Sequence, residues 1–93
     1  MKYNFEWDPN KAKTNKAKHD VSFEDAATVL KDPQSLTLFD EEHSVYEERW
    51  ITLGLAASGK LLVVCHTYKE IDVDNSLIRI FSGRRATKRE ADE

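Results

Sequence analysis

Helical signals early in this chain are followed by a series of strand signals. The apolar residues between positions 23 and 30 recur at the spacing of one helix face, and Asp32-Pro33 ends that helix. The predicted strands, including one that precedes the helices, are residues 3–7, 35–39, 50–55, 60–68 and 77–82. We therefore predict an α+β fold in which two N-terminal helices pack on a four- to five-stranded antiparallel sheet.

Capping residues mark the ends of the predicted helices. Asp8-Pro9 is typical of an N-cap followed by proline at the first helical position, and this helix should end near His19. Ser22 caps the second helix. Near the end of the chain, Thr87 and Glu90 form a capping box, which predicts a short C-terminal helix.

The alternation within the strands predicts which side chains face the helices. Ile51, Leu53 and Leu55 are expected to point into the core together with the isoleucines of the last strand. Trp50 and Arg79 would then project from the other face of the sheet. A shift of one residue in register would reverse these assignments.

Length and composition place further limits on the chain. Its 93 residues are expected to form a single domain, residues 1–93. The N-terminus has no apolar signal core, and no apolar run is long enough to cross a bilayer, so we expect a cytoplasmic protein with no membrane partner. A single cysteine excludes an internal disulfide and agrees with a reducing compartment.

The net charge of −3 hides an uneven distribution. Residues 1–20 carry a net +2, residues 21–50 a net −6 and residues 51–93 a net +1. Such a surface can accept RNA on one side and a basic protein partner on the other. The alternative is that the acidic run is simply a solvated face.

The segment Leu77–Glu90 concentrates cations at one end of a strand. Its sequence, LIRIFSGRRATKRE, contains four arginines and one lysine. Guanidinium groups gathered in this way suit a phosphate, because each planar group can hold two of its oxygens. The segment therefore predicts an anion site, and phosphate is the natural ligand.

The candidate catalytic residues follow from the chemistry of RNA cleavage without a metal ion. The 2′-hydroxyl of RNA can attack the adjacent phosphorus if a base, an acid and fixed cations are supplied. Arg79, Arg84 and Arg49 are the candidate cations. His66 is the first candidate acid or base because histidine titrates near neutral pH, and Glu48 is the second.

A second group of residues is expected to bind RNA. Lys11 and Lys18 fall on one polar face of the first helix, and His19 follows them. Trp50 offers a ring for base stacking, and Arg85 adds a cation. Each has a structural alternative: the lysines can be solvated, Trp50 and His66 can belong to the core, and Arg84 and Arg85 can cap the sheet or pair with the acidic loop.

Other site chemistries are poorly supported by the sequence. The three histidines lack metal-ligand spacing, and no glycine-rich phosphate loop is present, so we expect neither a metal nor a cofactor. Cys65 and His66 are neighbours in a strand and point to opposite faces, which argues against a thiol–imidazole nucleophile.

Four ordered motifs resemble the BrnT family, the toxins of bacterial type II toxin–antitoxin pairs. They are FEWDPNKAKTNKAKHDVSFEDAATVLKDP at residues 5–33, ERWITLG at 48–54, LLVVCHTY at 61–68 and IRIFSGRRATKRE at 78–90. The chain departs from the family pattern at Asp20, where glycine is usual, and at Cys65 and Gly83.

The resemblance implies a RelE-like fold and a metal-independent ribonuclease that halts translation and growth. It also implies neutralisation by a BrnA-like antitoxin with a ribbon-helix-helix domain, and contact with operator DNA only through that antitoxin. A non-catalytic RNA- or protein-binding module that uses the same cationic strand end is the alternative function.

Overall fold

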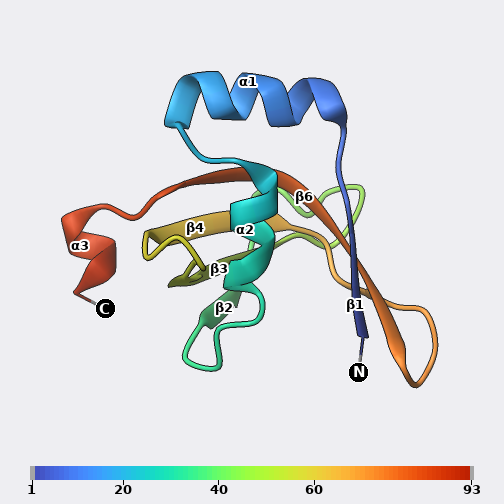
Figure 1. Cartoon of the computed structure of the whole chain (residues 1–93). Helices are drawn as coiled ribbons and strands as arrows, with labels where there is room; N and C mark the ends of the chain where they lie inside the picture. The colour runs from blue at the N-terminus through green and yellow to red at the C-terminus, as the bar shows by residue number, and fades with distance from the viewer. Residues whose placement is uncertain (1, 93) are drawn as a thin grey trace.

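The computed structural model describes residues 2–92, which form three helices and one mixed sheet (Figure 1). In chain order the elements are β1 (Lys2–Glu6), α1 (Pro9–His19), α2 (Phe23–Val29), β2 (Leu36–Phe39), β3 (Trp50–Leu55), β4 (Leu61–His66), β5 (Lys69–Glu70), β6 (Asn75–Arg85) and α3 (Lys88–Ala91). The predicted α+β class is confirmed. Among the described residues, no helix has the length and apolar character needed to span a membrane.

The sheet has the strand order β1-β6-β4-β3-β2, and β5 also pairs with β6. β1 runs parallel to β6, with Phe5 opposite Ile78, whereas the other pairs are antiparallel. The prediction of a purely antiparallel sheet was therefore wrong. A hairpin makes two strands antiparallel when they follow one another along the chain. β1 instead pairs with the last strand, to which no hairpin connects it.

β6 is longer than its predicted range of 77–82 because the strand continues to Arg85. Arg84 and Arg85 pair with Val63 and Leu62 of β4. Gly83 permits this continuation under α2, since a Cβ atom there would lie 3.1 Å from the Cβ of Ala26. The two arginines therefore lie within the sheet and not beyond its edge.

The core lies between α2 and one face of the sheet. α2 presents Phe23, Ala26 and Val29, all of which are buried. Trp7 packs edge-to-face on Phe23, with ring centroids 5.9 Å apart. The sheet residues that complete this core are Leu62, Val64, Ile78 and Ile80.

The predicted facing of β3 was wrong. Thr52 and Gly54 are the buried residues of this strand, and a Cβ atom at Gly54 would lie only 2.9 Å from Val29 of α2. The helix packs so closely that it requires a small residue there. The apolar side chains Ile51, Leu53 and Leu55 consequently lie on the face opposite α2, which we call the open face.

Of the two other predicted orientations, that of Arg79 is confirmed and that of Trp50 was wrong. Arg79 alternates with the buried Ile78 and Ile80 and therefore projects from the open face, as predicted. Trp50 lies opposite His66, which is itself opposite Ile80, so its side chain shares the face that carries α2.

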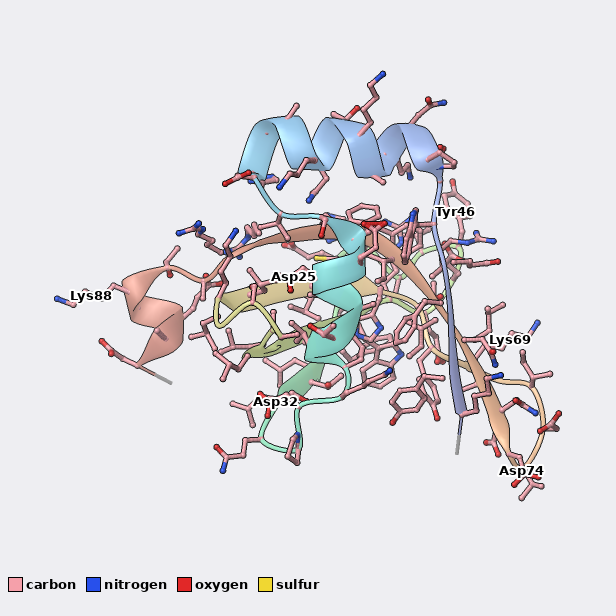
Figure 2. All side chains as sticks on the ribbon, viewed as in Figure 1. Asp25, Asp32, Tyr46, Lys69, Asp74 and Lys88 are labelled. Carbon is pink, nitrogen blue, oxygen red and sulfur yellow. The ribbon has the colours of Figure 1, made fainter. Side chains whose placement is uncertain are left out.

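Side chains from α2 and the following turn hold the β3–β4 hairpin against the helix. The carboxylate of Asp25 accepts a hydrogen bond from the backbone of Ser58 at 3.2 Å. Asp32 accepts one from the backbone of Leu55 at 2.9 Å. Figure 2 shows the two acids near opposite ends of α2, so this short helix is fixed at both ends.

Asn15 attaches α1 to β6, at a part of β6 that lies beyond its pairing with β1. Its amide nitrogen donates to the carbonyls of Val21 and Gly83 at 3.0 and 2.8 Å, and its oxygen accepts from the Gly83 N–H at 3.2 Å. The side chain thus pairs with both backbone groups of a strand residue. α1 ends at Asp20, which adopts the left-handed conformation at φ 56° that the usual glycine would adopt more easily.

Candidate functional site

The candidate site is centred on Phe81, which is the extra residue in a bulge of β6. Ser82 pairs with Cys65 and Ile80 pairs with His66, so Phe81 has no partner on β4. Bulges change the direction in which a side chain points. Here the bulge presents the aromatic ring to cations from two other segments.

These cations are Lys11 of α1 and Arg49, which precedes β3. The Nζ atom of Lys11 lies 5.4 Å from the centroid of the Phe81 ring, and Cζ of Arg49 lies 4.1 Å from it. Both distances are within the range of a cation–π interaction. The ring therefore holds two positive charges near one another without neutralising either.

Arg49 is only partly satisfied by its neighbours. Its Nε atom is buried and has no hydrogen-bond partner among the described residues. Its nearest carboxylate is Glu47, at 3.7 Å, which is a weak ion pair. A buried donor without an acceptor is unusual and costs stability. The side chain as a whole is 34% exposed and only weakly paired, so the rest of the guanidinium has capacity for an anionic ligand.

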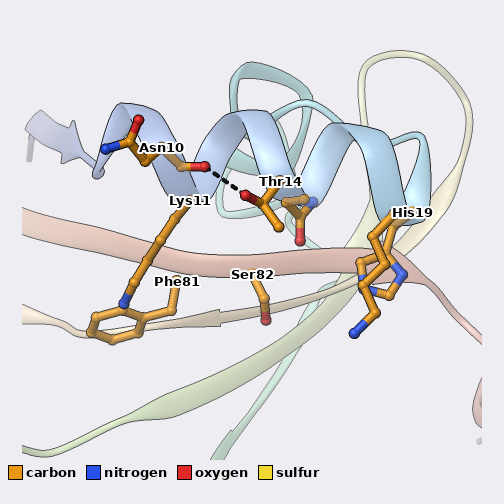
Figure 3. A pocket seen from close by; sticks show the side chains of 8 residues that line it. Asn10, Lys11, Thr14, His19, Phe81 and Ser82 are labelled. Carbon is orange, nitrogen blue, oxygen red and sulfur yellow. Dashed lines mark hydrogen bonds between the residues drawn. The ribbon is translucent and has the colours of Figure 1, made fainter.

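α1 and β6 border an open hollow of about 400 Å³ beside Phe81 (Figure 3). Figure 3 shows the Lys11 side chain extending from α1 to the ring of Phe81. The hollow continues along α1 to Lys18 and His19. Three predicted RNA-binding residues therefore line one cavity.

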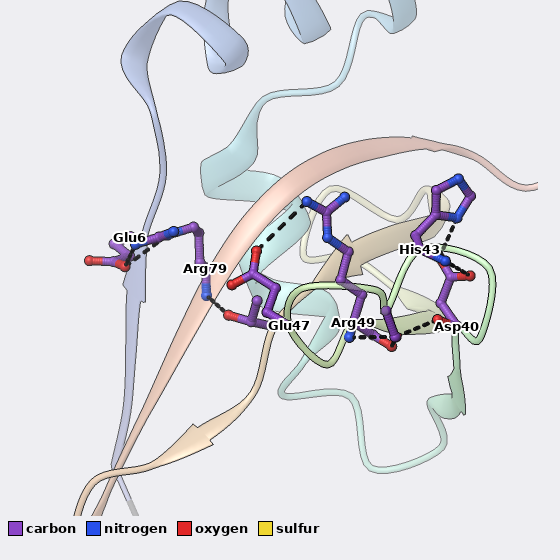
Figure 4. A network of polar contacts seen from close by, with 8 residues as sticks. Glu6, Asp40, His43, Glu47, Arg49 and Arg79 are labelled. Atoms are coloured by element: carbon purple, nitrogen blue, oxygen red, sulfur yellow. Dashed lines mark hydrogen bonds and ion pairs between the residues drawn. The ribbon is translucent and has the colours of Figure 1, made fainter.

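Arg79 lies in the next two hollows along the sheet. It shares one, of about 330 Å³, with Lys11 and Phe81, and the other, of about 380 Å³, with Glu48. Its guanidinium pairs with Glu6 of β1, with Nε and Nη2 each 3.0 Å from Oε1 (Figure 4). The three hollows are adjacent, because each shares lining residues with the next, and we call them together the α1–β6 groove.

Carboxylates from the loop between β2 and β3 border the far end of the α1–β6 groove. Glu47 and Glu48 line the hollow that contains Arg79. Figure 4 shows Glu47 between Arg79 and Arg49. Both carboxylates line the hollow of Arg79, which is a suitable position for a general base next to a bound phosphate.

Arg84, in contrast, is already paired. Its two terminal nitrogens donate to the two oxygens of Glu90 at 2.7 and 2.8 Å. These bonds and the Thr87 N–H lower the pKa of Glu90 to about 2, so the carboxylate is ionised at neutral pH. The predicted capping box of Thr87 and Glu90 is confirmed, and Arg84 anchors α3 to β6. Arg85 is exposed at the end of β6, outside the three hollows.

His66 is buried on the face that carries α2, where only 2% of its surface is exposed. Its Nδ1 lies 2.8 Å from the Thr67 carbonyl, and its Nε2 lies 2.7 Å from the Thr52 hydroxyl. Because a carbonyl only accepts, Nδ1 carries the proton and Nε2 accepts from Thr52. Burial lowers the pKa of His66, although the bond to Thr67 opposes the shift. The structure does not bring this imidazole to the α1–β6 groove.

The buried imidazole predicts an acid-sensitive fold. The unfolded chain binds the His66 proton at the ordinary pKa of 6.5, whereas the folded chain binds it only at lower pH. We therefore expect the free energy of unfolding to fall as the pH drops below 6.5, by at most about 1.4 kcal/mol per pH unit from this group. Urea unfolding between about pH 7.5 and pH 5 measures this dependence.

One variant provides the control for this measurement. His66→Gln should flatten the dependence. A dependence that persists in His66→Gln would contradict the assignment.

Trp50 lies outside the groove. Its ring packs edge-to-face on Phe39 at a centroid distance of 5.0 Å. Together with His66 and Tyr68 it lines a separate hollow of about 480 Å³ on the α2 side of the sheet. The structure thus brings together Lys11, Lys18, His19, Glu48, Arg49 and Arg79, and it separates from them His66, Trp50, Arg84 and Arg85.

Sequence reasoning missed Phe81 and Glu6 as site residues. No local pattern indicates the bulge that exposes Phe81, because the register shift arises from pairing with β4. The alternation of residues 3–7 does place Glu6 on the polar side of its strand. Its contact with Arg79 depends on the parallel pairing of β1 with β6.

The site shows no arrangement of metal ligands. No three His, Cys, Asp or Glu side chains in residues 2–92 are grouped so as to hold a metal ion. Metal-independent chemistry stays a prediction that requires a direct test.

Residues 7–90 match a family model described as the ribonuclease toxin, BrnT, of type II toxin–antitoxin systems. The matched range includes the groove residues from Lys11 to Phe81. No match was found among curated proteins.

Proposed function

We propose that this chain, which belongs to the BrnT family of ribonuclease toxins of type II toxin–antitoxin systems, cleaves RNA at the α1–β6 groove. Membership of the family implies an RNA target and an antitoxin partner. The proposal adds the location of the site, a mechanism without a metal ion, and inhibition of translation and growth as the consequence of cleavage.

One observation carries the proposal. Cations from three distant segments gather around Phe81: Lys11 and Arg49 lie over its ring, and Arg79 lines the same hollow. The ion pairs of the two arginines are partly exposed. Exposed pairs contribute little stability, so a phosphate can replace the carboxylates at small cost.

In the proposed mechanism Arg79 and Arg49 bind the scissile phosphate. Glu48 removes the proton of the 2′-hydroxyl, whose oxygen forms a bond to phosphorus as the bond to the 5′-oxygen breaks. Lys11, in the hollow it shares with Arg79, supplies the proton that the leaving 5′-oxygen requires. The products are a 2′,3′-cyclic phosphate and a 5′-hydroxyl. The arginines stabilise the additional negative charge of the phosphorane.

Lys18 and His19 are proposed to bind the neighbouring nucleotides. They line the hollow that extends along α1 from Lys11, so they can contact phosphates beside the scissile one. His66 is not included among the groups that contact RNA, because it is buried and both its nitrogens are hydrogen-bonded. Arg84 is proposed to position α3 through Glu90.

The remaining family features are also proposals for this chain. The antitoxin is proposed to be BrnA-like, with a ribbon-helix-helix domain through which the complex contacts operator DNA. The fold is proposed to be of the RelE type.

The test is cleavage of RNA by the purified chain in the presence of EDTA. We expect fragments that end in 2′,3′-cyclic phosphate and begin with a 5′-hydroxyl, from free RNA or from RNA on translating ribosomes. Cleavage that occurs only with added Mg²⁺ would refute the metal-independent mechanism. RNA binding without cleavage in either substrate, together with normal growth after induction, would establish the non-catalytic alternative.

A further inference from the structure

A stripe of apolar side chains crosses the open face of the sheet on β2 and β3. In the antiparallel register Leu36 lies opposite Leu53, and Leu38 lies opposite Ile51. Leu36, Leu38 and Leu55 are 55%, 68% and 53% exposed. Scattered exposed leucines are common, whereas adjacent ones on two paired strands form a patch that marks an interaction site.

β2 is also the outermost strand on its side of the sheet. Its sequence, LTLF, contains no proline, lysine or other charged residue. Natural proteins usually protect an edge strand with such residues, because its free N–H and C=O groups can pair with another chain. The edge of β2 lacks this protection, so it can accept an additional strand.

The loop that follows β2 determines the charge of a suitable partner. Residues 40–48 contain five carboxylates and no lysine or arginine. The same loop exposes Val45 and Tyr46, at 76% and 99%. A segment lying along β2 therefore needs aliphatic side chains over the leucines and basic side chains near the loop.

This chemistry distinguishes between the possible occupants. RNA finds only aliphatic side chains on the stripe, which do not favour base stacking, and Asp40, Glu41 and Glu42, which directly follow β2, repel its phosphates. A second copy of this chain brings its own acidic loop, with no lysine or arginine in that loop to compensate. A separate protein with a basic, aliphatic segment fits both features.

We propose that an extended segment of the antitoxin adds to the edge of β2 as a further strand and covers the leucine stripe. This proposal rests on the toxin–antitoxin assignment and not on the cleavage mechanism. Main-chain hydrogen bonds to β2 provide affinity, and alternate side chains of the segment contact Leu36 and Leu38. Its lysine or arginine residues pair with the loop of residues 40–48.

The leucine stripe is separate from Arg79. β3 and β4 lie between β2 and β6, the strand that carries Arg79, which places β2 and β6 about 14 Å apart at the usual strand spacing. Variants of the stripe should therefore affect neutralisation alone, and variants of Arg79 should affect toxicity alone.

The experiment uses the double variant Leu36→Asp/Leu38→Asp. We expect it to arrest growth when expressed alone and to escape neutralisation when the antitoxin is co-expressed. Its affinity for the purified antitoxin should fall by at least about 100-fold, because two carboxylates replace leucines that the bound segment would bury. Val73→Asp is the matched control, since Val73 is 81% exposed on the β5–β6 turn and lies away from the stripe. Normal neutralisation of the double variant would overturn the proposal.

Amide hydrogen exchange on the wild-type chain provides a second measurement that does not depend on the variant. Added antitoxin should protect residues 36–39, and protection confined to other segments would overturn the proposal. A wild-type dimer that Leu36→Asp/Leu38→Asp dissociates would assign the stripe to a second copy and would equally overturn it. An inactive chain that still shows protection of β2 would refute the proposed cleavage while supporting this surface.

Discussion

Replacing Arg79 with alanine is expected to reduce RNA cleavage by about 10²–10³-fold, because the phosphorane loses a fixed donor. The guanidinium projects from the open face and lines two of the three hollows of the groove. Arg79→Lys should recover only part of the rate, since an ammonium group cannot hold two phosphate oxygens in one plane. Initial rates on a labelled RNA, and growth after induction, measure both effects.

The loss should not result from unfolding. The pair between Arg79 and Glu6 is about half exposed and contributes at most about 1 kcal/mol, so the melting temperature should change little. Arg89→Ala is the control, because Arg89 is an exposed arginine on α3 outside the groove. Full cleavage by Arg79→Ala, with the circular dichroism spectrum unchanged, would remove the groove as the active site.

Replacing Asn15 with alanine is expected to lower the free energy of unfolding by about 3 kcal/mol or more. Three buried hydrogen bonds disappear together, which leaves the Gly83 N–H and the carbonyls of Gly83 and Val21 without this partner. This loss is a large fraction of the stability of a small domain. Urea or thermal unfolding followed by circular dichroism measures it.

Asn10→Ala is the matched control for this substitution, because Asn10 lies on the same helix with an exposed side chain. It should change stability by less than about 0.5 kcal/mol. Since Asn15 attaches α1 to β6, its loss should also weaken RNA binding by Lys11 and Lys18. If Asn15→Ala is as stable as the wild type, the prediction is contradicted, and water replaces the amide with no loss in the free energy of unfolding.

The local parts of the fold were predictable from the sequence. Ser22 and Thr87 cap helices as their motifs predict, because capping depends on residues only a few positions apart. The facing of β3 was not predictable by alternation alone. Its apolar residues lie on the open face since α2 approaches Gly54 too closely for a larger side chain.

In the candidate site too, features that depend on nearby residues were predictable, whereas contacts between residues far apart in the sequence were not. Lys11, Lys18 and His19 line one hollow because helix periodicity alone places the two lysines on the same face. The contacts of Arg79 and Arg84 depend on partners that alternation does not reveal, Glu6 at the other end of the chain and Glu90 across a turn. Whether an arginine is available for a ligand follows from those partners.

The parallel pairing of β1 with β6 has a consequence for synthesis of the protein on the ribosome. β1 is made before its pairing residues, Asn75–Arg79, which lie far along the chain. Their strand, β6, also carries Arg79 and Phe81. A nascent chain from which β6 has not emerged can complete neither the sheet nor the groove, so both form at the same stage of synthesis.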